Sequence, residues 1–209
     1  TLVKFLTANN IPLILAEKIG LVIRRKNKDG YYDRFRGRIM FPIRDVDGKV
    51  VGFGGRTLGG EEPKYMNSPE SEIYHKKSIL YGLDKSMDYI RRKKQAIVVE
   101  GYMDFLSIYL AGIKNVVATL GTSLTRDHAS LLRRYTDRVI VVFDGDEAGI
   151  KASLRVLEVF LEEWVSPLMV VLPKGQDPAS LISEGRRDEF MRLLEGATPL
   201  LDFFIERTM

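Results

Sequence analysis

Residues 95–104 read Gln-Ala-Ile-Val-Val-Glu-Gly-Tyr-Met-Asp, and residues 138–146 read Arg-Val-Ile-Val-Val-Phe-Asp-Gly-Asp. In both stretches a short run of Val and Ile ends in a carboxylate. Similar apolar runs occupy residues 114–118 and 168–172, and segments with the patterning of helices separate the four runs. This alternation predicts an α/β fold with a mainly parallel four-stranded sheet flanked by helices.

Upstream of this alternation, residues 1–94 are predicted to form a smaller, basic α+β subdomain that is truncated at its start. Asp29-Gly30 and Asp47-Gly48 are typical of hairpin turns, and the second joins an antiparallel pair over 38–44 and 49–53. Residues 61–78 are polar with scattered aromatic residues and are expected to form an ordered loop. We expect the metal-binding domain to span 95–176, and a C-terminal helical subdomain to begin over 177–209.

Composition narrows the chemistry. The chain has 209 residues, 45% hydrophobic and 29% charged, with no Cys and two His. Disulfides, thiolate zinc sites and cysteine nucleophiles are therefore excluded, and any metal must be held by oxygen. No apolar run is as long as the roughly 20 residues of a membrane span, and no signal peptide opens the chain, so we expect a cytoplasmic protein without membrane contact.

Charge is divided unevenly along the chain. Residues 1–94 carry 20 Lys or Arg and 11 Asp or Glu, whereas residues 95–209 carry 12 and 17. A basic half followed by an acidic half favours a bound polyanion together with a carboxylate metal site. The alternative is that both sets of charged residues are ordinary solvent-exposed surface residues without a binding role.

Acidic residues follow three of the predicted strands. Glu100 and Asp144 come directly after the first and third strands, Asp146 follows at once, and Asp177 lies five residues after the fourth strand. Because ligands of parallel sheets lie at the carboxyl ends of the strands, we expect these acids to meet at one edge. Carboxylate oxygens suit a hard cation such as Mg²⁺, and Gly101 and Gly145 would let it come close.

Each acid also has a purely structural interpretation. Asp146 can cap the helix expected over 147–163, and Asp177 can begin the last helical segment before Pro178. Asp144-Gly145 can form a turn, and Glu100 can be a first-turn charge. Only the coincidence of several acids at one edge favours a metal site.

The pair Glu100-Gly101 and Asp144-Gly-Asp146, each after a strand, resembles the Toprim domain over residues 95–178. The segments 32–45, 51–56, 63–70, 74–76 and 80–82, followed by 100–104, 120–123 and 143–146, resemble in order the RNA polymerase domain of bacterial DnaG-type primases. This resemblance spans about residues 30–205.

The resemblance implies an enzyme of DNA replication, a DNA primase that synthesises short RNA primers from ribonucleoside triphosphates on single-stranded DNA. Two divalent cations, Mg²⁺ or Mn²⁺ in its place, would assist nucleotidyl transfer, with no zinc in this fragment. Glu100, Asp144 and Asp146 would be the catalytic acids. These three and Asp177 would hold the cations, with Asp104 as an auxiliary acid of the metal site. The family usually has Asp-Pro-Asp at the last position, whereas this chain has Asp177-Pro178-Ala179.

The resemblance also gives the basic half a role. By their places in the matching motifs, the residues that would contact template or triphosphate are Arg36, Arg56, Lys64, Asn67 and Lys76. Tyr65 and Tyr74 alternate with Lys64 and Lys76, as in grooves where single-stranded bases stack on rings. The alternative is that both tyrosines fill the core of the small subdomain.

Further partners follow from the same resemblance: an RNA–DNA hybrid, and a replicative helicase of the bacterial primosome bound through a region absent here. The zinc module of the family needs cysteines that this chain lacks, so we expect weak activity from this chain alone.

Two rival functions would use the same acidic residues. A Toprim nuclease would lack the segments 34–44 and 63–69, and a non-catalytic module would bind DNA or nucleotides without turnover. A topoisomerase would need a further domain.

Overall fold

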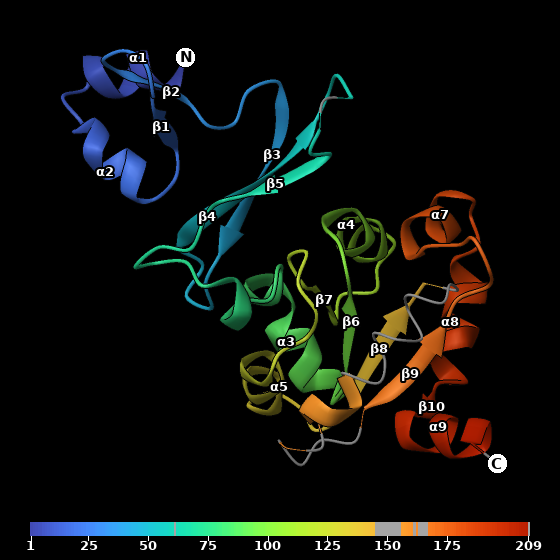
Figure 1. Ribbon diagram of the computed structural model, residues 1–209. Coiled ribbons are helices and arrows are strands. Elements are labelled where there is room, and N and C mark those ends of the chain that lie inside the picture. The colour runs from blue at the N-terminus through green and yellow to red at the C-terminus, as the bar shows by residue number, and fades with distance from the viewer. Residues whose placement is uncertain (61, 145–155, 161, 163–166, 209) are drawn as a thin grey trace. The chain divides into compact units, whose positions relative to one another are not determined.

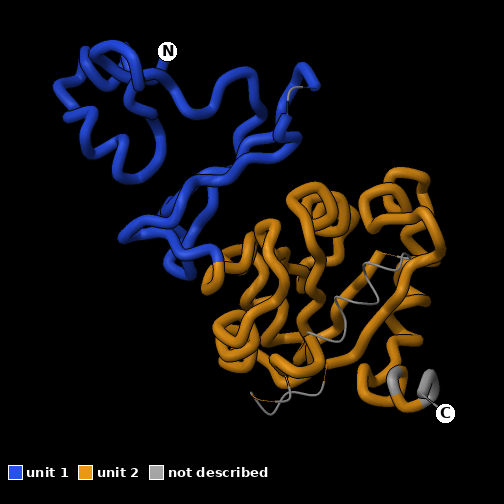
Figure 2. Tube along the Cα trace, viewed as in Figure 1, with its two compact units in different colours: residues 1–76 blue, residues 77–209 orange. Residues whose placement is uncertain are grey.

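The computed structural model describes residues 1–60, 62–144, 156–160, 162 and 167–208. The chain divides into two units, residues 1–76 and residues 77–209 (Figure 2). Of the helices in the described ranges, none combines the length and the apolar composition needed to cross a bilayer.

The N-terminal part of the first unit is a small cluster of two helices and a hairpin. Its elements are α1 (Leu2–Ala8), α2 (Leu13–Lys18), β1 (Val22–Arg24) and β2 (Tyr31–Asp33). Leu6, Ala16 and Val22 form its buried core. The Asp33 carboxylate accepts hydrogen bonds from the backbone N–H groups of Leu2 and Val3 at 2.8 and 2.9 Å. These are helix N–H groups without an intrahelical partner, so β2 anchors α1. The turn predicted at Asp29-Gly30 is confirmed by the antiparallel β1–β2 pair.

The rest of the first unit is an antiparallel sheet of three strands in the order β3-β4-β5 (Figure 1). The strands are β3 (Arg38–Arg44), β4 (Val50–Thr57) and β5 (Tyr65–Asn67). The β3–β4 hairpin predicted around Asp47-Gly48 is confirmed. The prediction of a loop over 61–78 is wrong at Tyr65–Asn67, because these residues pair with Gly54–Arg56 of β4.

The second unit contains a five-stranded sheet in the order β10-β9-β8-β6-β7. Its strands are β6 (Ala96–Val99), β7 (Val116–Ala118), β8 (Val139–Phe143), β9 (Leu168–Val171) and β10 (Thr198–Pro199). The first four are parallel and coincide with the four apolar runs of the sequence, which confirms the predicted fold class. The two-residue β10 adds an antiparallel edge that the sequence pattern did not predict.

Helices accompany this sheet on both faces (Figure 1). Those described are α3 (Leu83–Lys93), α4 (Tyr102–Leu110), α5 (Arg126–Arg133), α7 (Pro178–Ser183), α8 (Arg187–Glu195) and α9 (Leu200–Thr208), with a 3₁₀ turn at Lys76–Ser78. Most of the helix predicted over 147–163 lies outside the described residues. The predicted domain boundaries near residues 94 and 176 stay predictions.

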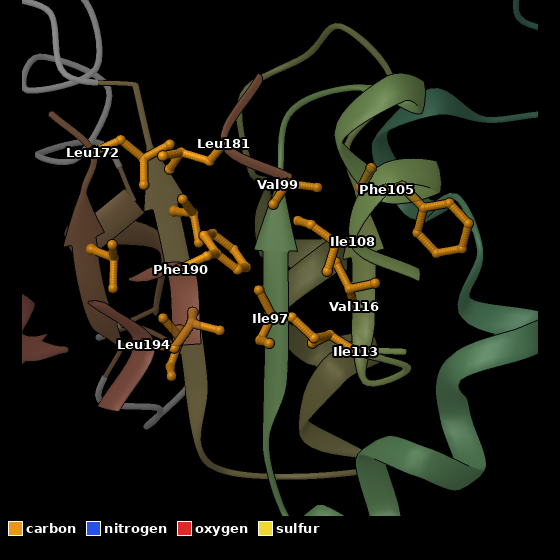
Figure 3. Packing of buried hydrophobic residues seen from close by; sticks show 14 residues of the cluster. Ile97, Val99, Phe105, Ile108, Ile113, Val116, Leu172, Leu181, Phe190 and Leu194 are labelled. Carbon is orange, nitrogen blue, oxygen red and sulfur yellow. The ribbon is translucent and has the colours of Figure 1, made fainter. Parts of the chain in front are cut away.

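Alternate residues of the central strands pack into a core shared with α4, α7 and α8 (Figure 3). Ile97 and Val99 of β6 lie at its centre, between Phe190 of α8 and Ile108 of α4, and all four are at most 2% exposed. Every residue of β6 and β8 is buried. Since both faces of these strands are covered, they contain no polar position, and the chain can place polar groups only where the strands end.

His128 is the most buried polar side chain of α5. Its backbone N–H donates to Thr125 Oγ1, while its ring Nδ1 accepts from the Thr125 N–H at 3.3 Å. The ring Nε2 lies 3.2 Å from the carbonyl oxygen of Ile79, so Nε2 carries the proton. The ring therefore ties the first turn of α5 to the segment before α3.

Gly82 offers a direct test of the core. It has φ +80°, and a Cβ at this position would overlap the Phe105 ring. We expect Gly82→Ala to lower the free energy of unfolding by about 3 kcal/mol, because a left-handed backbone and a core clash add. Gly112 has φ +90° but open space around it, so Gly112→Ala should cost only about 1 kcal/mol. Urea denaturation measures both, and equal losses would contradict the packing argument.

Candidate metal centre and nucleic-acid surface

The acidic site is built by strand ends of the second unit. β6 pairs in parallel with β8, and β8 with β9, so these strands finish side by side. Glu100 directly follows β6, and Asp144 directly follows β8. Asp177 lies beyond β9, immediately before α7. The strand order therefore places Glu100, Asp144 and Asp177 after the ends of three adjacent strands, at the sheet edge where the sequence predicted them.

Asp104 lies in the first turn of α4, and the charges of all these carboxylates act on its carboxyl group. Burial raises the pKa of its carboxyl group, and the nearby charges of Asp177, Asp144 and Glu100 raise it further, to about 6. One contact acts in the opposite direction, since the Ala179 N–H donates to Asp104 Oδ1 at 3.3 Å. The charges of three neighbouring carboxylates contribute to this displaced pKa, as expected for acids carried by the ends of adjacent strands.

Gly101 gives Asp104 its place beside the end of β6. A Cβ on Gly101 would lie 2.9 Å from Asp104 Oδ2, closer than real Cβ atoms approach. The end of β6 is held by the residue that follows β7, since the Thr119 N–H donates to the Val99 carbonyl at 3.0 Å. The Thr119 hydroxyl also donates to the Glu100 carbonyl at 3.4 Å. Small and hydroxyl-bearing residues thus hold the backbone from which the acids project.

Asp177 has the structural role that its sequence also suggested. It is the N-cap of α7: its Oδ1 accepts from the Ser180 N–H at 2.6 Å, and Ser180 Oγ accepts from the Asp177 N–H at 3.1 Å. The cap engages one carboxylate oxygen. Since its charge also raises the pKa of Asp104, Asp177 is both a helix cap and a member of the acidic region.

The complete metal-ligand set is not visible in the described ranges. Asp146, predicted to act with Asp144, lies outside them. Among the residues that the structure describes, no three His, Asp or Glu side chains are arranged so that they could hold one metal ion. The charges of the described acids oppose one another, since three of them raise the pKa of Asp104, and a divalent cation relieves such repulsion.

Four of the predicted nucleic-acid residues lie together on β4 and β5 of the first unit. Arg56 and Tyr65 are directly opposite in the β4–β5 ladder, and the Arg56 guanidinium lies 5.8 Å from the centre of the Tyr65 ring. Lys64 is exposed just before Tyr65, and Asn67 follows two residues after it, opposite Gly54. This cluster combines positive charge with a partly exposed ring.

The other two predicted contacts lie apart from this cluster. Arg36 is exposed in the segment between β2 and β3, with its guanidinium 5.1 Å from the centre of the Tyr32 ring. Lys76 begins the 3₁₀ turn, and its backbone N–H donates to Glu70 Oε1 at 3.0 Å. The structure thus groups four of the six predicted residues.

The stacking role considered for Tyr74 is wrong. Its side chain is 0% exposed, and a Cβ added to Gly52 would lie 3.2 Å from its ring. Burial raises the pKa of its hydroxyl. Tyr74 is a core residue of the first unit, so the plain interpretation holds for this tyrosine, whereas Tyr65 is 36% exposed.

Two residues with evident roles were missed from the sequence. Thr119 holds the Glu100 backbone, and Arg38 donates to three backbone carbonyls near Lys64. Neither belongs to a pattern with a distinctive residue type, because both act on backbone atoms that are distant in sequence.

Two protein families match the chain. Residues 1–87 match the DNA primase catalytic core, N-terminal domain, and residues 97–182 match the Toprim-like family. The DNA primase of Synechococcus elongatus is 43% identical over 204 residues, which are 95% of this chain and 29% of that protein. The chain thus spans less than a third of this relative's length.

Two solved structures extend this likeness to the fold. A DnaG primase catalytic domain bound to single-stranded DNA has a TM-score of 0.91 and 40% identity, over 100% of this chain and 68% of that one. The RNA polymerase domain of Mycobacterium tuberculosis primase DnaG has a TM-score of 0.88 and 35% identity, over 98% and 69%.

The raised pKa of Asp104 makes stability depend on pH. Its carboxyl group stays protonated to about pH 6 in the folded chain, but only to about pH 4 when unfolded. Between these values the folded state binds more protons, so stability falls as pH rises. We expect metal-free Asp104→Asn to unfold about 5 °C higher than the parent at pH 7.5, equivalent to roughly 2 kcal/mol, and at the same temperature as the parent at pH 3.5.

Thermal unfolding in EDTA measures this difference. Asp88→Asn, at an exposed position of α3, is the matched control and should leave the midpoint unchanged at both pH values. A midpoint gap between Asp104→Asn and the parent that does not depend on pH would contradict the assignment.

Proposed function

Since this chain belongs to the family of DnaG DNA primases, we propose that it is the nucleotidyl-transfer core of a replicative primase. Its substrates are ribonucleoside triphosphates, its template is single-stranded DNA, and its product is a short RNA primer paired to the template. The observation that carries this proposal is the placement of Glu100 and Asp144 directly after the adjacent parallel strands β6 and β8. Asp104 and Asp177 lie at the starts of α4 and α7, which the bond from the Ala179 N–H to Asp104 joins.

The acidic region suits Mg²⁺, with Mn²⁺ as a substitute. Glu100, Asp144 and Asp146 are the proposed catalytic ligands, and Asp177 and Asp104 complete the set. Magnesium binds few protein carboxylates and completes its shell with water and substrate phosphates, which fits oxygen-only surroundings. When bound, the cations supply charge stabilisation for the attacking and leaving oxygens of a phosphoryl transfer.

The chain's own residues contribute position and charge. Glu100 and Asp144 directly follow two strands that the β6–β8 ladder holds in register. Asp104 holds a proton up to about pH 6 when no cation is bound, and below that pH this lowers the repulsion among the acids. Ala179 stands where the family usually has a second Asp. Here its backbone N–H donates to Asp104, so the auxiliary acid is fixed without a further negative charge.

The β4–β5 cluster is the proposed contact with template or triphosphate. Arg56 and Lys64 provide cations for phosphates, Asn67 provides an amide, and Tyr65 provides a ring on which a base can stack. Arg36 and Lys76 extend the contact from neighbouring segments. The relative that was solved with single-stranded DNA supports a nucleic-acid role for this chain.

The setting of this activity is also part of the proposal. We place the chain in the bacterial cytoplasm at the replication fork, where the full-length protein would meet the replicative helicase through a region outside these 209 residues. Because the chain spans only 29% of the length of the cyanobacterial relative, we expect its activity alone to be weak.

Primer synthesis tests the acidic site. With labelled single-stranded DNA, four ribonucleotides and Mg²⁺ or Mn²⁺, we expect short RNA from the parent chain. Glu100→Gln and Asp144→Asn should each lower the yield at least about 100-fold, because fewer ligands hold the cations. Asp88→Asn should retain the parent yield. Shortened DNA in place of new RNA would identify a nuclease, and undiminished synthesis by both variants would remove these acids from catalysis.

Salt dependence of DNA binding tests the basic cluster. We expect Lys64→Ala to weaken binding of a labelled oligothymidylate about threefold to tenfold, and to reduce the slope of log K against log salt by about one unit or less. Lys49→Ala, in the exposed β3–β4 turn, should change neither quantity. Fluorescence anisotropy at several salt concentrations gives both, and an unchanged slope for Lys64→Ala would place Lys64 outside the contact.

A further inference from the structure

Arg38, the first residue of β3, makes an unusual set of contacts for a residue at a strand end. A single nitrogen, Nη1, donates to the Pro63 carbonyl at 2.8 Å and lies 3.2 Å from the Gly55 carbonyl and 3.5 Å from that of Lys64. Two of these acceptors belong to the segment that leads into β5. An ionised donor shared among carbonyls forms hydrogen bonds stronger than neutral ones.

The backbone of β4 is shaped to let this side chain through. A Cβ on Gly55 would lie 3.0 Å from Arg38 Cδ and 2.9 Å from Phe35 Cδ1. The Arg38 stem therefore crosses directly over Gly55, and only a residue without a side chain leaves this route open. Gly55 and Arg38 thus act together: Gly55 leaves space for the arginine side chain, and Arg38 forms the hydrogen bonds to the carbonyls.

The segment that Arg38 holds is the one that carries the proposed contacts. Lys64 and Tyr65 are both exposed, and β5 has only three residues to keep them in place (Figure 1). Its first partner pair is Arg56 with Tyr65. Before that pair the Thr57 N–H donates to the Lys64 carbonyl at 3.0 Å, and Arg38 Nη1 approaches the same carbonyl. A short edge strand frays easily unless other bonds fix it.

We propose that Arg38 is a positioning residue for nucleic-acid binding, which holds Lys64 and Tyr65 in their binding arrangement through the carbonyls of Pro63, Lys64 and Gly55. This rests on the proposed function of the β4–β5 cluster. Arg38 acts through backbone atoms and not by touching the nucleic acid. Its effect on binding therefore requires the side chains of Lys64 and Tyr65, and it does not require the Arg38 charge to be near a phosphate.

A matched arginine lies at the other end of the same strand. Arg44 is the last residue of β3, and its Nη1 donates to the Gly48 carbonyl at 2.5 Å, in the turn between β3 and β4. It makes the same kind of bond, but to a turn that carries none of the proposed contacts. Arg44→Met is therefore the control for losing an arginine anchor from β3.

Binding of a labelled oligothymidylate is measured for a set of variants. We expect Arg38→Met to weaken binding about fivefold in the parent chain, but less than about twofold in the Lys64→Ala/Tyr65→Ala background, because residues that act as a unit are not additive. Gly55→Ala, which keeps the arginine but blocks its route, should weaken binding to a similar extent. Arg38→Lys should recover part of the loss, and Arg44→Met should bind as the parent does.

Amide hydrogen exchange supplies a measurement that does not depend on DNA. In Arg38→Met and Gly55→Ala the Thr57 amide should exchange about tenfold faster or more, since its bond to Lys64 lies in the segment released. In Arg44→Met it should exchange at the parent rate. Unchanged exchange in Arg38→Met would overturn the proposal, whatever the binding data show.

The remaining outcomes separate this proposal from the proposed function. If the parent chain does not bind DNA, both fail. If Lys64→Ala/Tyr65→Ala lowers affinity but Arg38→Met does not, only the positioning role fails. It also fails if Arg38→Met lowers affinity equally in both backgrounds, which would indicate a direct contact with DNA or a general loss of structure.

Discussion

The parallel ladder between β6 and β8 is the constraint on which the acidic site depends. Ala96, Ile97 and Val98 are in register with Val139, Ile140 and Val141, so the two strands end side by side, with β8 one residue longer at this edge. Because every residue of the two strands is buried, the first positions that can carry charge are the ones just after them. Glu100 and Asp144 stand there. A shift of register by one residue would change the spacing of these acids and would also misplace the core side chains.

Bringing acids together in this way opposes folding, and the structure limits the effect without removing it. Asp104 lies in the first turn of α4, where the helix dipole favours a negative charge, and it accepts one backbone hydrogen bond from Ala179. These two stabilising contacts do not balance burial and three neighbouring carboxylates, since its pKa is raised to about 6. Unfavourable charge that persists at one sheet edge is characteristic of a site kept for binding.

Features of the structure that depend on neighbouring residues can be predicted from the sequence, whereas features that depend on contacts between distant residues cannot. The strands β6 to β9 and the acids after β6 and β8 are visible because a buried strand needs a continuous apolar run, and that is a local property. The third strand of the first sheet was predicted as a loop, since Tyr65–Asn67 becomes a strand only by pairing with β4. Tyr74 and Tyr65 look alike in sequence. Only the space above Gly52 makes the first a core residue.

Structural and functional interpretations of one residue need not exclude each other. Asp177 caps α7 through Oδ1, and its charge also reaches Asp104. The cap fixes where that charge lies, because the α7 N-terminus is itself tied to α4 by the bond from Ala179 to Asp104. Arg38 follows the same logic in the first unit, where bonds to backbone carbonyls determine where neighbouring exposed side chains lie. In both units, ordinary backbone contacts set the geometry of the groups that we propose as ligand contacts.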